Sequence, residues 1–270
     1  MTIPKFLKFS IILSIIITIP MTNFAQSSYE MNWKRDGALM VVGLPLAAFG
    51  VVLDRSITPL TLEEVNNLNR SDIIELDRFI SFIHSENAAS LSDILLYSCL
   101  ASPFLLFTSK SIRKDFTVIS GMYLESLIFG IALPAYGKGS IQRIRPYAYN
   151  PDVPLEKKLT AEAKRSFFSG HTTMGFTSMV FLSTIYSTYY PDSKAKPYIW
   201  TGSLVLASTI GYLRMAAGSH FPTDAIVGAI VGSAIGYLIP KIHKTNTQNL
   251  ESMMPNDSPR TPLISFKFAL

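Results

Sequence analysis

Three short groups of residues in the second half of the chain have the types and spacings that are needed to bind and transfer an anion. They are Lys138 with Arg145 and Pro146, the run Ser169-Gly170-His171, and Arg214 with His220 and Asp224. Together they supply three cations, two imidazoles, a hydroxyl beside a glycine and one carboxylate. This set suits the transfer of a phosphoryl group through a histidine, because cations stabilise the phosphoryl oxygens while an imidazole attacks phosphorus.

The third group has a spacing that places an imidazole and a carboxylate on one side of a helix. Pro222 suits the first turn of a helix, and a helix that begins near His220 brings Asp224 onto the same face. That face also holds three glycines that allow close helix packing, Gly228, Gly232 and Gly236. We expect Asp224 to contact His220 and fix its tautomer, which leaves the other ring nitrogen free as a nucleophile. Arg214 can grip two phosphoryl oxygens with its guanidinium.

The other two groups provide further binding groups and a proton donor. Ser169 and Gly170 precede an apolar run, and the backbone N–H groups at a helix start favour anions. The Ser169 hydroxyl can donate a hydrogen bond, and His171 is placed to protonate a leaving oxygen. Lys138 and Arg145 add two cations at the end of an earlier apolar run.

Composition indicates a membrane protein. Hydrophobic residues make up 48% of the 270 residues and charged residues 16%, well below the roughly 25% charged residues of soluble domains. Mean hydropathy is +0.28. The net charge of +5 does not indicate a nucleic-acid partner, because seven of the 24 Lys and Arg residues lie between Lys138 and Arg165, around the anion-binding groups. The single cysteine, Cys99, excludes a disulfide within the chain.

The apolar residues gather into stretches that indicate an all-α integral membrane bundle of about six helices. They cover residues 37–53, 94–108, 116–136, 172–189, 198–216 and 225–240. Several are somewhat shorter than the roughly 20 residues of a membrane span. A soluble helical protein with an apolar core is the alternative, but sustained apolar runs are rarely so dense in soluble folds. The Ser, Thr and Gly residues in these runs would pack helix against helix.

The regions outside these stretches differ in character. The first 25 residues resemble a signal peptide or an N-terminal anchor, since a basic start precedes an apolar run. Segment 54–93, between the first two stretches, has apolar residues near helical spacing and predicts short amphipathic helices, with Thr61 and Glu64 in a capping box. The chain is thus divided into a signal or anchor, a membrane bundle and a flexible polar tail, with bounds 1–25, 36–241 and 242–270.

Basic residues in the short links predict the orientation. They are Lys110, Arg113 and Lys114, then Lys194 and Lys196, then Lys241 and Lys244. The positive-inside rule places these links in the cytoplasm, so the loop 138–170 and the turn 218–223 face the periplasm or exterior of an inner membrane. A secretory signal followed by six full spans would invert this orientation. Either stretch 37–53 does not cross the membrane, or the signal behaves unusually.

The three groups together resemble the signature of a known family. Lys138-x6-Arg145-Pro146, Ser169-Gly170-His171 and Arg214-x5-His220-x3-Asp224 look like the three-part motif of the type 2 phosphatidic acid phosphatase superfamily, over about residues 90–241. The resemblance implies a six-helix bundle, and hydrolysis of phosphate monoesters or diphosphates, commonly on lipids, that needs no metal or other cofactor. It also implies that His220 forms a phosphohistidine, Asp224 orients His220 and His171 protonates the leaving group. The phosphoryl oxygens would be held by Lys138, Arg145, Ser169, Gly170 and Arg214.

Some neighbouring residues depart from the family pattern or receive no role. Phe168 stands where proline often precedes the Ser-Gly-His run, and we expect it to alter a turn or a substrate contact. Leu213 stands where serine often precedes the arginine, and we expect a hydrogen bond to be loosened. Arg143 is left without a role because its phase relative to Arg145 is undefined. His84 is interpreted as a surface or interfacial residue, and His243 as part of a cytoplasmic flank.

The leading hypothesis is therefore a membrane phosphatase that acts on a lipid phosphate or polyprenyl diphosphate at the outer face. Its partners are that lipid and the bilayer, and its oligomeric state stays open. A lipid phosphotransferase would use the same groups. A vanadium-dependent haloperoxidase shares the motifs, but such enzymes are usually soluble. A non-enzymatic scaffold or transporter subunit is disfavoured, because a scaffold has no need for two histidines and a carboxylate, and a transporter would carry ionisable groups deep inside its spans.

Overall fold

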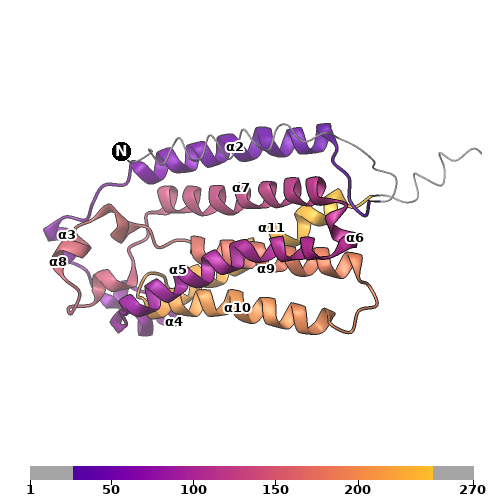
Figure 1. The fold of residues 1–270 in the computed structure, drawn as a ribbon. Coiled ribbons are helices and arrows are strands. Elements are labelled where there is room, and N and C mark those ends of the chain that lie inside the picture. The colour runs from indigo at the N-terminus through magenta and orange to yellow at the C-terminus, as the bar shows by residue number, and fades with distance from the viewer. Residues whose placement is uncertain (1–26, 246–270) are drawn as a thin grey trace, which may run out of the picture.

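The computed structural model describes residues 27–245, and this part of the chain is a bundle of helices (Figure 1). The predicted all-α membrane bundle is confirmed. The long helices are α2 (Trp33–Arg55), α5 (Glu86–Ala101), α7 (Phe116–Ile141), α9 (Gly170–Tyr189), α10 (Lys196–Ala216) and α11 (Pro222–His243). Each covers one of the predicted apolar stretches, and the 3₁₀ helix η3 (Ser102–Thr108) continues α5. The predicted signal segment and the tail after residue 245 lie outside the described residues.

Short helices form a cap at one end of the bundle, on the left in Figure 1. They are α3 (Leu62–Asn66), η1 (Arg70–Asp72), α4 (Glu75–Arg78), η2 (Phe79–Phe82), η4 (Pro146–Tyr149), α8 (Leu155–Lys158) and η5 (Ala161–Lys164). A further short helix, α6 (Lys110–Arg113), lies at the opposite end. The predicted capping box is present, since Thr61 Oγ1 accepts the Glu64 N–H at 3.1 Å and Glu64 Oε2 accepts the Thr61 N–H at 2.6 Å.

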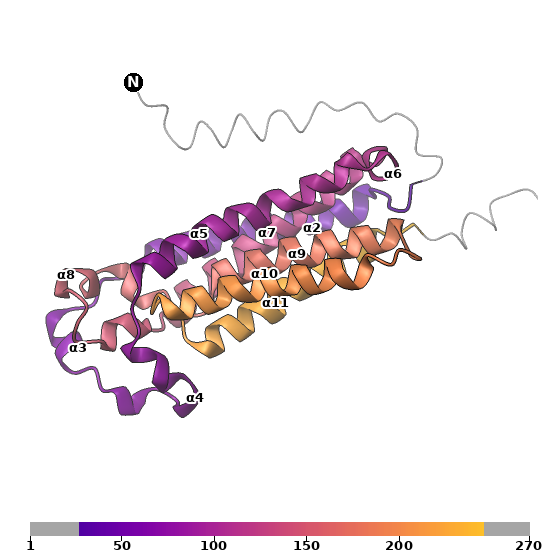
Figure 2. The same cartoon turned by 60° about the horizontal axis from the view of Figure 1, so that its bottom comes forward.

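Helix α9 is the inner helix of the bundle (Figure 2). It packs against α5, α7, α10 and α11, whereas α2 packs against α7 on the outside. Its buried side chains include many hydroxyls, among them Thr172, Thr173, Thr177, Ser178 and Ser183. Because these hydroxyls face other helices rather than lipid, α9 can be less apolar than a helix on the outside of the bundle.

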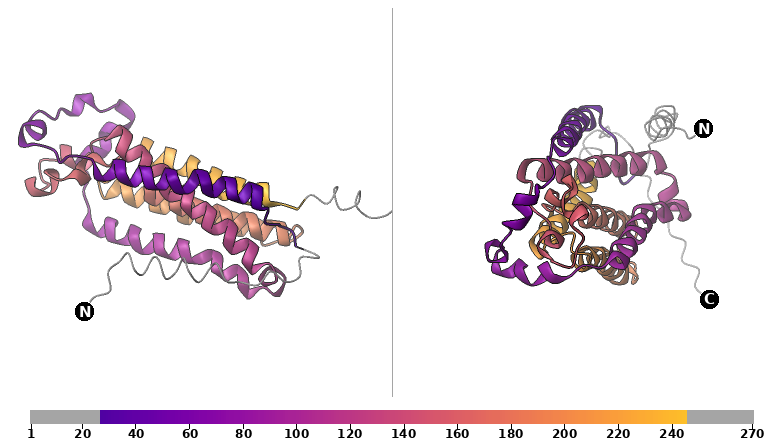
Figure 3. Two further views of the ribbon diagram at one scale, coloured as in Figure 1. Left: turned by 90° about the horizontal axis from the view of Figure 1, so that it is seen from above. Right: turned by 90° about the vertical axis from the view of Figure 1, so that its left-hand side faces the viewer.

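Four of the described helices are long and apolar enough to cross a membrane, and the chain is a multi-pass membrane protein. These are Trp33–Arg55, Glu86–Thr108, Phe116–Tyr149 and Pro222–His243. Stretch 37–53 therefore lies within a full-length candidate span, which runs beside α7 (Figure 3). Helices α9 and α10 have comparable length but do not meet the same criterion, so the total of six crossings stays a prediction.

The glycine face of α11 lies against α9, as its spacing predicts. A Cβ atom on Gly232 would lie 2.3 Å from the Thr173 carbonyl oxygen, and one on Gly236 would lie 2.5 Å from the Thr177 carbonyl oxygen. Gly228 is similarly close to the Ser169 carbonyl, at 2.8 Å. This contact sets the distance between the two helices that begin at the candidate site.

Replacing Gly232 by alanine is expected to lower the free energy of unfolding by about 1–3 kcal/mol, because the new methyl group meets rigid backbone and forces α11 away from α9. Thermal unfolding of the purified protein measures the change. Gly202→Ala on α10 is the matched control, since its Cβ would meet nothing within 4 Å. Equal stability of the Gly232 variant and the wild type would show that the close contact is dispensable.

Candidate active site

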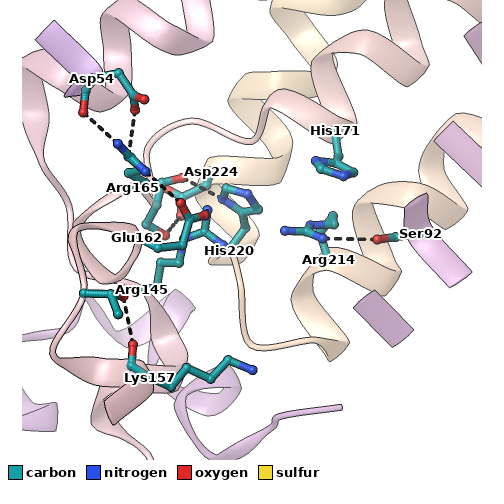
Figure 4. A network of polar contacts seen from close by, with 12 residues as sticks. Asp54, Ser92, Arg145, Lys157, Glu162, Arg165, His171, Arg214, His220 and Asp224 are labelled. Atoms are coloured by element: carbon teal, nitrogen blue, oxygen red, sulfur yellow. Dashed lines mark hydrogen bonds and ion pairs between the residues drawn. The ribbon is translucent and has the colours of Figure 1, made fainter. Parts of the chain in front are cut away.

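The three predicted groups meet at the capped end of the bundle. Lys138 lies in the last turn of α7 and Arg214 in the last turn of α10, while Ser169 caps α9 and Asp224 lies in the first turn of α11. Figure 4 shows the side chains of His171, Arg214 and His220 in one region, with Asp224 and Glu162 beside them. The basic links between α6 and α7 and between α9 and α10 lie at the other end of the bundle (Figure 1). Segments far apart in sequence therefore place two histidines at the same end.

His220 is held in a defined tautomer. It lies in the link before α11, is 1% exposed, and its Nδ1 is 2.6 Å from the Ser166 carbonyl oxygen. A carbonyl can only accept, so Nδ1 carries the proton and Nε2 keeps a lone pair. Burial, and then the cations of Arg145 and neighbouring residues, hold the pKa of His220 well below its usual range. The imidazole is thus neutral at neutral pH, as a nucleophile must be.

Asp224 does not make the direct contact with His220 that its spacing suggests. Its Oδ1 accepts a hydrogen bond from Arg143 at 2.5 Å, and its Oδ2 accepts from Ser166 Oγ at 2.5 Å and the Phe221 N–H at 2.9 Å. The spacing argument assumed that both residues lie in the helix. Because α11 begins at Pro222, the His220 ring turns toward the Ser166 carbonyl instead. Asp224 is linked to His220 indirectly, because it accepts from the Ser166 hydroxyl and the Ser166 carbonyl accepts from His220 Nδ1.

Arg143 is a member of the site that the sequence interpretation left out. Its guanidinium donates to Asp224 Oδ1 at 2.5 Å, to Asp77 Oδ2 at 2.7 Å and to Thr223 Oγ1 at 2.8 Å. Asp77 lies in α4 of the cap and is fully buried. The chain turns at Gln142, which has a φ of 49° after the end of α7. Arg143 therefore lies outside the helix, and residue spacing does not predict where its side chain points.

His171 has a carboxylate partner that was also missed. Its Nε2 is 2.7 Å from Oδ1 of Asp93 on α5. An ionised carboxylate can only accept, so Nε2 carries a proton. Arg214 lies on the other side of Asp93, with Nη1 3.6 Å from the same oxygen and 3.3 Å from Ser92 Oγ. The His171 Nε2 proton and the Arg214 guanidinium thus both face the same oxygen, Asp93 Oδ1.

Arg145 is paired with a carboxylate in the structure. Its side chain is 5% exposed and pairs with the Glu162 carboxylate, which also pairs with Arg165 at 3.1 Å. Burial raises the pKa of Glu162, but Arg145 and the neighbouring cations outweigh that effect and lower it. The signal for Glu162 in the sequence is weak, because its neighbours Lys164 and Arg165 suggest an exposed charged loop.

Ser169 and Gly170 shape the remaining wall. The Ser169 hydroxyl oxygen accepts from Thr172 Oγ1 at 2.9 Å and from the Thr172 N–H at 3.4 Å, so it acts as the N-cap of α9. Its own proton stays available to an acceptor. A Cβ atom on Gly170 would lie 3.6 Å from Lys138 Nζ. The start of α9 therefore lies next to the Lys138 ammonium group.

Two cavities flank these residues. One of about 250 Å³ is lined by Lys138, Gly170 and His171 and by apolar side chains of the spans, among them Leu96, Ile131 and Met174. The other, about 280 Å³, is lined by residues of the cap and of the link after α10, including His84, Arg145, Lys157, Glu162 and Ser219. His84 is thus not a plain surface residue, and its Nδ1 contacts the Ala217 carbonyl oxygen at 2.9 Å.

The two departures from the family pattern have structural explanations. Phe168 is buried, and its ring lies 3.1 Å from where a Cβ on Gly137 would stand, so it packs the link against α7. Leu213 packs with Ala88 and Ala217, between α10 and α5. Both positions serve packing between elements of the described chain.

The sequence is similar to a known protein family and to several curated proteins. The model of the PAP2 superfamily matches residues 119–248. Among curated proteins, a lipid A 4'-phosphatase of Porphyromonas gingivalis is 31% identical over 53% of this chain, and an undecaprenyl-diphosphatase of Sulfolobus acidocaldarius is 29% identical over 56%. The alignments span 58% and 66% of the length of those relatives.

One solved structure, "Crystal structure of Aquifex aeolicus LpxE", is 26% identical, covers 62% of this chain and 94% of its own, and has a TM-score of 0.42. The family match contains every residue of the three groups, from Lys138 to Asp224. The resemblance that the motifs carried is thus confirmed, since residues 119–248 match the PAP2 superfamily.

Proposed function

We propose that this protein is a membrane phosphatase that hydrolyses a lipid phosphate or a polyprenyl diphosphate through a phosphohistidine. One observation carries the proposal. His220 is buried and neutral, with Nδ1 bonded to the Ser166 carbonyl, so that Nε2 is free to attack beside the cations Arg145 and Arg214. The names of the two relatives, a lipid A 4'-phosphatase and an undecaprenyl-diphosphatase, support the same reaction class.

In the first proposed step, His220 Nε2 attacks phosphorus, the bond from phosphorus to the leaving oxygen breaks, and a phosphorus–nitrogen bond forms. Lys138, Arg145 and Arg214 stabilise the charge on the equatorial oxygens. His171, as an imidazolium, donates its Nε2 proton to the leaving oxygen and becomes neutral; the leaving oxygen replaces the Asp93 carboxylate as the acceptor at that nitrogen. In the second step, water attacks phosphorus, His171 accepts the water proton, and the phosphorus–nitrogen bond breaks.

The two cavities support a lipid as the substrate. The cavity beside His171 has apolar walls from Leu96, Ile131 and Met174, which suit an acyl or prenyl chain. The lining of the cavity beside Arg145 includes Lys157, Thr160 and Ser219, whose polar groups can bind a headgroup. We further propose that this end faces the periplasm or exterior of the inner membrane, since the basic links lie at the other end.

A panel of lipid phosphates tests the proposal. Full-length protein in detergent is incubated with phosphatidic acid, phosphatidylglycerol phosphate, undecaprenyl diphosphate and a phosphorylated glycolipid, with chelator in the assay. We expect phosphate release from at least one lipid even with chelator present, because the cations that stabilise charge are side chains. Lipid that disappears without phosphate release, in the presence of an alcohol acceptor, would instead identify a phosphotransferase. No turnover of any lipid would contradict both.

Replacing Glu162 by glutamine is expected to tighten inhibition by inorganic phosphate roughly two- to fivefold, the effect of removing one partly exposed ion pair. The carboxylate competes with an incoming phosphate for Arg145, and glutamine keeps its shape without the charge. Inhibition constants of the two proteins measure the effect. Glu63→Gln, an exposed carboxylate on α3, is the control. Weaker inhibition of the Glu162 variant would show that the carboxylate helps to bind the anion.

A further inference from the structure

A second polar cluster lies at the end of the bundle opposite the candidate active site. It consists of Asp36 in the first turn of α2, Glu125 in α7 and His243 at the end of α11. His243 Nε2 is 3.1 Å from Asp36 Oδ1 and 3.1 Å from Glu125 Oε2. The side chains are 11%, 1% and 0% exposed for Asp36, Glu125 and His243. His243, which the sequence places in a flank after the last apolar stretch, is therefore a buried residue of the bundle.

The tautomer of His243 directs a lone pair into this cluster. Nδ1 lies 2.8 Å from the Ile239 carbonyl oxygen, which can only accept, so Nδ1 carries the proton of the neutral ring. Among the described residues, Nε2 has no hydrogen bond of acceptable geometry, although two carboxylate oxygens lie within 3.1 Å. Both oxygens of Glu125 also lack a hydrogen-bond donor in the described part of the chain.

This arrangement leaves negative charge uncompensated inside the bundle. Asp36 has partners of its own, since Oδ1 accepts from Arg35 Nε at 2.7 Å and Oδ2 from the Asn32 N–H at 2.6 Å. Glu125 has none and lies within a membrane span, where an isolated carboxylate is expensive. A lone pair and two carboxylates that face one another at this distance need a positive charge between them.

We propose that Asp36, Glu125 and His243 bind one divalent first-row transition-metal cation such as Zn²⁺ or Mn²⁺. Their ligand atoms lie within 4.8 Å of one another. Atoms that bind one ion at about 2.1 Å lie roughly 3.0–3.4 Å apart, which agrees with the two contacts of His243. One imidazole with two carboxylates suits these cations, and an imidazole whose other nitrogen donates to a backbone carbonyl is the usual arrangement of a metal-bound histidine.

Such a metal ion would join the first described long helix to the last. α2 packs on α7, and the cluster adds a link from both of these helices to α11. Other contacts converge at the same place, because Arg35 donates to the Ile242 carbonyl at 2.8 Å and the Glu30 N–H donates to the His243 carbonyl at 2.9 Å. The proposed role is therefore structural, and it is independent of the proposed phosphatase reaction at the other end.

Metal binding to the full chain tests this proposal directly. The affinity tag is removed, the protein is stripped with chelator in detergent, and Zn²⁺ alone is added and then dialysed away. Elemental analysis is expected to find one Zn²⁺ per chain, with a higher thermal unfolding midpoint. Glu125→Gln should weaken binding at least roughly tenfold. Glu30→Gln, an exposed carboxylate at the same end, should bind as the wild type does.

Two further measurements keep the outcome clear. Co²⁺ substitution of the wild type is expected to produce visible ligand-field bands, which decides the question even if the Glu125 variant does not fold. Wild-type protein that retains no Zn²⁺ would overturn the proposal, and so would equal Zn²⁺ binding by the Glu125 variant. Phosphate release is recorded separately, since its loss or retention bears on the proposed function and not on this site.

Discussion

His220→Ala is expected to reduce phosphate release from a lipid phosphate by about 10⁴-fold or more, the scale of loss seen when a covalent nucleophile is removed. The reason is specific to the observed tautomer. The Ser166 carbonyl accepts a hydrogen bond from the Nδ1 proton, which leaves Nε2 as the attacking atom. Single-turnover assays with radiolabelled substrate measure the loss and also trap the labelled, acid-labile phosphohistidine in the wild type.

His171→Ala distinguishes the proposed role of His171 from that of His220. This variant removes the proton donor, so its rate of phosphate release should fall about 10²–10⁴-fold with a lipid substrate. The rate should fall much less with an aryl phosphate, whose leaving group needs no proton. His220→Ala should stay inactive with both substrates. Turnover of the aryl phosphate by the His220 variant, or phosphohistidine trapped on another residue, would contradict the covalent role of His220.

Arg143→Ala is expected to lower the free energy of unfolding by about 3–5 kcal/mol, because it leaves buried carboxylates without their cation. Asp77 and Asp224 are each fully buried, and both bond to the Arg143 guanidinium. Since Asp224 also holds Ser166, the variant should lower turnover together with stability. Thermal unfolding and phosphate release on the same samples measure the two effects.

A second substitution distinguishes lost charge balance from lost packing. In the Arg143→Met background, Asp77→Asn removes one of the uncompensated charges and should restore part of the stability. Arg113→Ala, an exposed arginine at the opposite end, should change the free energy of unfolding by less than about 0.5 kcal/mol. An Arg143→Ala protein as stable as the wild type would show that the network with α4 contributes little.

The sequence was sufficient for features that depend on composition and helical period. Long apolar runs located the six long helices, and the spacing of Gly228, Gly232 and Gly236 predicted the close contact of α11 with another helix. The ends of those runs also marked where His171 and His220 lie, because helix ends of a bundle gather at its two faces. Helix positions and the spacing of residues on one helix face depend only on residues that are close together in the sequence.

The sequence was insufficient wherever a partner comes from a distant segment. The direction of the Arg143 side chain depends on the turn at Gln142. The hydrogen-bond partner of His220 depends on the start of α11, which is at Pro222 and not at His220 itself. His243 has basic neighbours in sequence and no local signal of burial, yet it is completely buried and contacts Asp36 of α2 and Glu125 of α7. No local pattern encodes contacts of this kind, since they arise only when helices far apart in the chain are assembled.

The segment before α7 has a consequence for how such proteins diverge and are engineered. Asp77 and Asp93 precede residue 119, where the family match begins, yet they hold Arg143 and His171. A chimaera built by transplanting the matched region alone would leave both of those side chains without their carboxylates. Substrate preference can therefore drift through mutations in the leading segment, while the recognisable motif stays unaltered.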